Sequence, residues 1–227
     1  MPRCHFNELD LIIQLYGSAV FTFMMCPPPL FAEIIKVNYL RARATQPETR
    51  TMEETARLTE EAYEILGRID AAALDKWAES KPSSREDWLL AGNAYRAAAA
   101  LYCVSSLQGQ AVLPPESTTL QARRTTDARF LETVLSEALQ SPKINRYMFW
   151  PLVVLGTEAA RLGPTTCAFV RDQLARLSRF VGTHVPLSAR AILEKFWASG
   201  GTRWDDCFDR PHGFVIQIAI DMGGMTP

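Results

Sequence analysis

The side chains best suited to acid–base chemistry lie near the C-terminus, in the stretch Trp204-Asp205-Asp206-Cys207-Phe208-Asp209-Arg210-Pro211 and in His212 directly after it. A carboxylate close to an imidazole can exchange a proton with it, so His212 with Asp205 or Asp209 is a candidate acid–base pair. Acidic residues are also favoured in the first turn of a helix, and this stretch follows a Gly-Gly break. Two interpretations therefore stay open: proton transfer, or a loop histidine beside helix-capping acids.

Glu158 and His184 are the other candidates for proton transfer. His184 lies in a predicted loop that precedes a proline. Glu158 lies among apolar residues of a predicted helix, and three interpretations stay open for it. It is an exposed or capping carboxylate, a buried carboxylate paired with an arginine such as Arg96 or Arg190, or a ligand contact. If the chain is an enzyme, the candidate catalytic groups are Glu158, His184, Asp205, Asp206 and His212.

The five cysteines do not form a pattern typical of a disulfide framework or a zinc site. Their number is odd, their spacing is wide, and Cys4-His5 is the one close pair of potential ligands, whereas structural zinc needs four. We therefore expect a reducing intracellular compartment, no metal and no cofactor. Cys103 is expected in the core, and Cys207 is expected to be more exposed. The sequence also lacks Gly-x-Ser-x-Gly, a phosphate-binding loop and His-Glu-x-x-His, so no common catalytic motif supports an enzyme.

Composition and charge favour a single helical domain over residues 1–227. Hydrophobic residues make up 48% of the chain, which is enough to bury a core, and no long linker divides it. Lys and Arg total 24 and Asp and Glu total 25, for a net charge of −1. The longest basic cluster, Arg123-Arg124 with Arg129, is interpreted as a solvated helix face. Because a nucleic-acid-binding domain usually carries a basic patch, direct nucleic-acid binding is not expected.

Hydrophobic periodicity predicts helices throughout the chain. The most apolar segment, residues 9–25, contains polar residues and is shorter than the roughly 20 residues that span a bilayer, so it is predicted to be a buried helix without membrane association. Thr51 and either Ser83 or Ser84 are expected to cap helices. The other predicted helices cover about residues 30–44, 52–70, 71–80, 85–107, 118–140, 147–161, 164–181, 187–198 and 213–222. Short loops between them predict an all-α fold of sequentially packed antiparallel helical hairpins, with about eight to ten helices.

Five short segments follow one another in an informative order. They are Cys26-Pro27-Pro28-Pro29-Leu30-Phe31 with Ile34 to Arg41, Trp88 through Tyr95 to Cys103, Phe149-Trp150-Pro151-Leu152 with Gly156 and Glu158, Leu193-Glu194-Lys195-Phe196-Trp197, and Trp204-Asp205-Asp206-Cys207-Phe208. Together, over about residues 16–214, they resemble the fungal-specific transcription factor regulatory domain. That domain is the C-terminal part of many zinc-binuclear-cluster regulators.

The resemblance implies a nuclear, all-α domain that represses or activates an attached DNA-binding module. It also implies a protein partner or homodimer and a small apolar ligand, and it carries over no catalytic or metal-binding residues. The six closely spaced cysteines and the basic stretch with which that family binds DNA do not occur in this sequence. We therefore expect this chain to make no direct contact with DNA.

Two further interpretations stay open. The first is a stand-alone cytoplasmic enzyme, an isomerase or cyclase of fungal secondary metabolism, which would need an apolar pocket with a few acids and histidines. The second is a chain that dimerises with a full-length relative and inhibits it. The sequence is compatible with a natural short protein, a truncated gene or a fragment.

Overall fold

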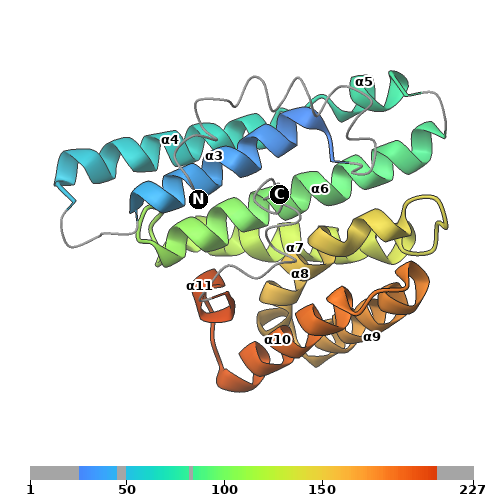
Figure 1. Cartoon of the computed structure of the whole chain (residues 1–227). Helices are drawn as coiled ribbons and strands as arrows, with labels where there is room; N and C mark the ends of the chain where they lie inside the picture. The colour runs from blue at the N-terminus through green and yellow to red at the C-terminus, as the bar shows by residue number, and fades with distance from the viewer. Residues whose placement is uncertain (1–25, 45–49, 82–83, 209–227) are drawn as a thin grey trace, which may run out of the picture.

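The computed structural model describes residues 26–44, 50–81 and 84–208. Over these ranges it contains nine α-helices and one 3-10 helix and no strand, so the predicted all-α fold is confirmed (Figure 1). The helices predicted over residues 9–25 and 213–222 lie outside the described residues, as does His212.

The observed helices follow the predicted order closely. They are α3 (Pro28–Ala44), α4 (Met52–Asp70), α5 (Leu74–Glu79), α6 (Arg85–Gly109), α7 (Thr118–Ala138), η3 (Asn145–Met148), α8 (Phe149–Leu162), α9 (Pro164–Val181), α10 (Val185–Ser199) and α11 (Trp204–Cys207). Helix α5 begins three residues later than the predicted start at Ala71. The acidic stretch near the C-terminus forms the short helix α11.

Helix α6 is the centre of the packing. It contacts α3, α4, α5, α7, α8 and α11, and Figure 1 shows it running across the middle of the molecule. Every residue from Ala97 to Gln108 is buried, including four consecutive alanines. Alanine has the highest helix propensity, and its small side chain lets neighbouring backbones approach from all sides. The sequence of α6 therefore suits a helix that is surrounded by others.

Local signals set the ends of several helices. The Thr51 hydroxyl accepts a hydrogen bond from the Glu54 backbone N–H at 3.1 Å, which confirms the predicted cap of α4. Ser84 precedes α6, but its side chain caps no backbone N–H there, so the predicted cap is wrong for this residue. Helix α10 ends at Ser199, and the next residue, Gly200, has a left-handed φ of 71°, which favours glycine.

Gly156 allows α8 and α10 to pack closely. The Trp197 indole N–H on α10 donates to the Gly156 carbonyl oxygen at 2.8 Å. A Cβ placed on Gly156 would lie 2.5 Å from Cδ1 of Leu193, which is itself fully buried. No side chain larger than hydrogen therefore fits at this position unless the Leu193 side chain or α10 moves.

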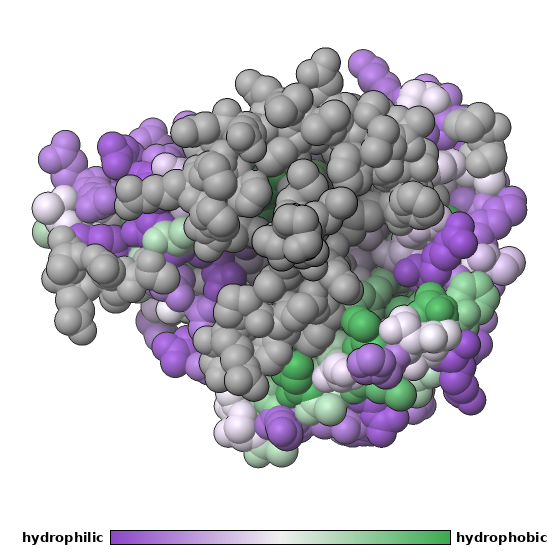
Figure 2. Space-filling model, in the orientation of Figure 1, coloured by the Kyte–Doolittle hydropathy of each residue, from purple (hydrophilic) through white to green (hydrophobic). Residues whose placement is uncertain are grey.

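The surface of the described residues is mainly hydrophilic on the left of the face in Figure 2, and hydrophobic residues gather low on that face. Individual large hydrophobic residues are exposed at the junction of α9 and α10, namely Phe180, Val181 and Leu187. None of the described helices combines the length and the hydropathy that a bilayer span requires.

The contact at Gly156 generates a stability prediction. Gly156→Ala should lower the free energy of unfolding by about 1–2 kcal/mol, because the overpacking penalty exceeds the gain in helix propensity. Gly67→Ala, on an exposed face of α4 where a Cβ meets nothing within 4 Å, should raise it by up to about 1 kcal/mol. Urea unfolding followed by circular dichroism measures both. A Gly156→Ala variant as stable as wild type would contradict the packing described here.

Candidate functional site

Helix α11 is anchored to the core by aromatic side chains. Trp204 is 2% exposed, and its ring makes an edge contact with Tyr102 on α6 at a centroid distance of 4.6 Å. Phe208 packs on Trp204 at 4.8 Å, and Tyr102 also contacts Trp150 on α8 at 6.1 Å. These contacts join α6, α8 and α11, so the aromatic residue of the acidic stretch belongs to the core.

Asp205 joins three elements through hydrogen bonds. Arg41 on α3 donates one Nη hydrogen bond to the Asp205 carboxylate and another, at 2.9 Å, to the Tyr102 hydroxyl. The Gln110 amide donates to the other Asp205 oxygen at 2.7 Å, and the Tyr102 hydroxyl donates to Asn38. The Asp205 carboxylate is thus occupied by partners that hold α11 against α3 and α6.

Asp206 caps α11. Its Oδ2 accepts the backbone N–H groups of Thr202 at 3.2 Å and Arg203 at 3.0 Å, and its Oδ1 accepts from the Arg203 guanidinium at 2.9 Å. Burial opposes ionisation, but these hydrogen bonds outweigh it and hold the pKa of Asp206 below its ordinary value. The capping interpretation of the acidic stretch therefore applies to Asp206.

Glu158 is 1% exposed and lies at the centre of an ion cluster with Arg124 and Arg161. Arg124 Nη2 on α7 donates to one carboxylate oxygen at 2.7 Å, and Arg161 Nη2 donates to the other at 2.7 Å. Arg124 Nη1 also donates to the Gln108 side-chain oxygen at 3.1 Å. The buried, arginine-paired interpretation of Glu158 is therefore correct, and the exposed or capping one is wrong.

The partners of Glu158 differ from those expected. Arg190 pairs with Glu194 at 2.9 Å and Arg96 donates to Asn93 at 2.8 Å, so neither of the arginines suggested from the sequence is used. The interpretation of Arg124 as part of a solvated face is also wrong, because it is 8% exposed. A signal for its burial exists: it lies four residues from both Leu120 and Ala128, which are buried on the same face of α7.

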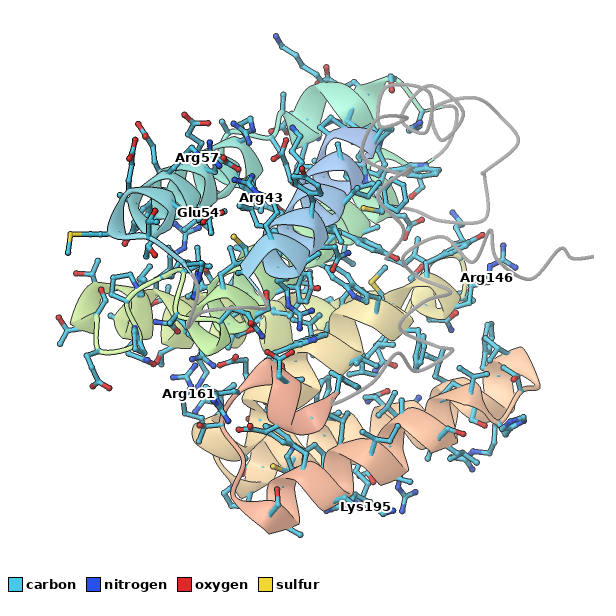
Figure 3. All side chains as sticks on the ribbon, turned by 60° about the vertical axis from the view of Figure 1, so that its left-hand side comes forward. Arg43, Glu54, Arg57, Arg146, Arg161 and Lys195 are labelled. Carbon is cyan, nitrogen blue, oxygen red and sulfur yellow. The ribbon has the colours of Figure 1, made fainter. Side chains whose placement is uncertain are left out.

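A pocket of about 620 Å³ opens beside the ion cluster. We call it the Arg124 pocket, and its walls come from α6, the loop before α7, α7, α8 and the loop between α10 and α11. The lining residues are Ser105, Gln108, Gly109, Pro115, Glu116, Gln121, Arg124, Thr157, Ala160, Arg161, Gly200, Gly201, Thr202 and Arg203. Figure 3 shows Arg161 at the end of α8, between α7 and the α9–α10 pair.

Two buried donors on residues that line the Arg124 pocket have no hydrogen-bond partner among the described residues. They are Arg124 Nε and the Ser105 hydroxyl, and the Ser105 residue is 3% exposed. An unpaired buried polar group costs about 1–3 kcal/mol, so such groups mark sites where a partner is expected. Sequence reasoning does not single out Ser105 as a site residue, because a serine in an alanine-rich helix carries no distinctive pattern.

The candidate catalytic residues that the structure describes do not all lie at one site. His184 is exposed at the start of α10, and the 15 residues of that helix, about 22 Å long, separate it from the loop that lines the Arg124 pocket. Glu158 is held by two arginines, and Asp205 and Asp206 have partners of their own. Each of these acids therefore forms ion pairs in the structure.

Cys103 and Cys207 are poor nucleophiles. Cys103 is fully buried, as expected, and burial raises the pKa of its thiol to about 12. The sequence predicts a more exposed Cys207, but this residue is only 6% exposed, and burial raises the pKa of its thiol to about 12 as well. The expectation fails because Cys207 lies on the inner side of α11, next to the anchored Trp204. The described residues also contain no His/Cys/Asp/Glu group arranged to hold a metal ion.

Residues 9–216 match the family described as the fungal specific transcription factor domain. Because this match covers most of the chain, the chain belongs to that family, and its resemblance to the regulatory domain is confirmed. The predicted regulatory role is the one that the family supports, and the enzyme alternative gains no support.

The chain is similar to the phomenoic acid biosynthesis cluster-specific transcriptional regulator of Leptosphaeria maculans. The two are 45% identical over 222 residues, which make up 98% of this chain and 42% of the relative. The chain thus spans less than half the length of that regulator. No solved structure gives a significant match.

The ion cluster predicts unequal effects of two adjacent arginines. Arg124→Ala should lower the free energy of unfolding by about 3–5 kcal/mol, because it leaves the buried Glu158 short of a partner. Arg123→Ala removes the more exposed pairs with Asp70 and Asp127, and it should cost less than about 1 kcal/mol. Chemical denaturation of both variants gives the two values. Equal losses would show that Arg124 is not the buried partner.

The thiol environments predict an order of alkylation. At pH 8 a thiol with a pKa of about 12 is ionised to roughly one part in ten thousand, so native Cys103 and Cys207 should resist iodoacetamide. Among the cysteines that the structure describes, Cys167 is only partly buried and should react first. The reactivity of Cys103 and Cys207 should increase as the pH rises toward their raised pKa values, because the thiolate is the form that reacts. Peptide mass spectrometry locates the label, and unfolding in urea should remove the protection. Equal labelling of Cys207 and Cys167 in the native chain would argue against the buried position of α11.

Proposed function

We propose that the chain is the regulatory domain of a nuclear transcription factor that controls a biosynthetic gene cluster of secondary metabolism. The observation that carries this proposal is the 45% identity to a cluster-specific transcriptional regulator across nearly the whole chain. The domain acts through a protein partner, a second copy or a small ligand, and the DNA is bound by another part of the regulator.

The charge distribution supports a role without direct DNA contact. The net charge is −1, and the three arginines of the basic cluster seen in the sequence all form ion pairs. Arg123 pairs with Asp70 and Asp127, Arg124 pairs with Glu158, and Arg129 pairs with Glu132. A DNA-binding surface needs cations free to contact phosphates, and these side chains are already neutralised.

A reporter assay tests the regulatory role. The whole chain, fused to a heterologous zinc-cluster DNA-binding module in a filamentous fungus, should change transcription of a reporter that carries the matching binding sites. The DNA-binding module alone is the control, and immunoblotting and microscopy should show equal amounts of both proteins in the nucleus. A fusion that is abundant and nuclear but leaves transcription unchanged would refute the proposal.

A separate experiment tests whether this domain binds DNA directly. The chain without a fused module should not retard the cluster's promoter fragments in an electrophoretic assay at low salt, where phosphate contacts are strongest. Tight binding that weakens steeply with added salt would show that the domain itself contacts DNA.

A further inference from the structure

We propose that the Arg124 pocket binds a small organic molecule through a carboxylate, which accepts hydrogen bonds from Arg124 Nε and the Ser105 hydroxyl. The binding itself stands on the geometry of the pocket. Its regulatory meaning rests on the function proposed above.

The unpaired donors define what the ligand must present. Ser105 and Arg124 are more than nine-tenths buried, they come from two different helices, and both line the same pocket. Arg124 Nε offers one N–H and the Ser105 hydroxyl one O–H, so the complementary group on a ligand is an acceptor oxygen. The two oxygens of a carboxylate can serve both donors at once.

The charge of the ion cluster favours an ionised acceptor over a neutral one. Arg124 and Arg161 contribute two positive charges and Glu158 one negative charge, which leaves one positive charge at the base of the pocket. On the opposite wall Arg203 is already balanced by Asp206, and the rim residue Glu116 is exposed to solvent. A single carboxylate completes the balance, whereas a doubly charged phosphate exceeds it.

The size and lining of the pocket suit a small molecule. Its volume of about 620 Å³ lies within the range of about 300–1,000 Å³ typical of ligand pockets. Ala160, Gly200 and Gly201 leave room beside the charged end, while Pro115 adds apolar surface. The sequence predicts an apolar ligand; this lining fits one that joins an apolar body to an acidic group.

Thermal-shift measurements and calorimetry on the full chain test the preference for a carboxylate. The probes are the monocarboxylates 4-phenylbutyrate and hexanoate, each compared with its neutral amide, and inorganic phosphate. We expect the carboxylates to raise the unfolding midpoint and to bind more tightly than the matched amides, with little effect of phosphate. Equal binding of acid and amide, or a response to phosphate alone, would overturn the proposal.

Two neighbouring serines provide a matched pair of variants. Ser105→Ala removes an unpaired buried hydroxyl, so the unliganded protein should be as stable as wild type or more stable, while carboxylate affinity should fall about tenfold or more. Ser106→Ala removes the hydrogen bond from its hydroxyl to the Tyr102 carbonyl, and Ser106 does not line the pocket. It should lower stability without changing affinity. A Ser105→Ala variant that binds like wild type would refute the proposed contact.

A blocking variant provides an independent measurement. Ala160→Phe places a bulky ring in the pocket from the solvent-exposed side of α8 and leaves every charge of the ion cluster in place. It should abolish the carboxylate-dependent shift while the circular dichroism spectrum stays unchanged. Unimpaired carboxylate binding by this variant would place the site elsewhere and refute the proposal.

The binding and reporter experiments separate failure of this inference from failure of the proposed function. If the wild-type fusion changes transcription but binds no carboxylate, the pocket assignment is wrong and the regulatory role stands. If the chain binds carboxylates through Ser105 but its fusion leaves transcription unchanged, the pocket assignment stands and the regulatory role is wrong.

Discussion

The carboxylate of Glu158 is buried among apolar residues of α8, and the need to balance its charge constrains the helices around it. Removing an ion from water is costly unless partners of opposite charge replace its hydration. Arg124 reaches the carboxylate from α7 and Arg161 from the end of α8, at 2.7 Å each. A rotation of α7 by one residue would turn Arg124 away, so this pairing fixes the rotation of α7 against α8 and shapes one wall of the Arg124 pocket.

The acidic stretch near the C-terminus solves a different structural problem. Helix α11 has only four residues, and a helix of that length has little stability of its own. Trp204 supplies buried area, Asp205 links it to Arg41 and Gln110, and Asp206 satisfies backbone N–H groups at its start. The mixture of aromatic and acidic residues that suggests proton chemistry in the sequence therefore holds a short helix in place.

The comparison of sequence and structure separates local from long-range information. Helix positions and the Thr51 cap follow from neighbouring residues, and they were predicted closely. The partner of Glu158 depends on which face of α7 meets α8. Arg124 lies 34 residues before Glu158 in sequence, so local patterns do not identify it, and Arg96 and Arg190 are the wrong partners. The burial of Cys207 depends on where Trp204 inserts. The unpaired hydroxyl of Ser105 cannot be predicted from the sequence for the same reason, because only the packed helices show that it has no hydrogen-bond partner among the described residues.

The position of the Arg124 pocket bears on how such a domain could regulate. A ligand alters a conformational equilibrium only by the difference between its affinities for the two states. The walls of this pocket come from α6 and α7, which pack together, and from α8 and the loop that leads into α11. That loop contains Arg203, whose contact with Asp206 caps α11, and α11 returns to α6 through Trp204. A molecule bound there contacts segments nearly 100 residues apart in sequence, Ser105 on α6 and Arg203 before α11. Any rearrangement that separates them would forfeit its binding energy, and this is the thermodynamic requirement for ligand-dependent control.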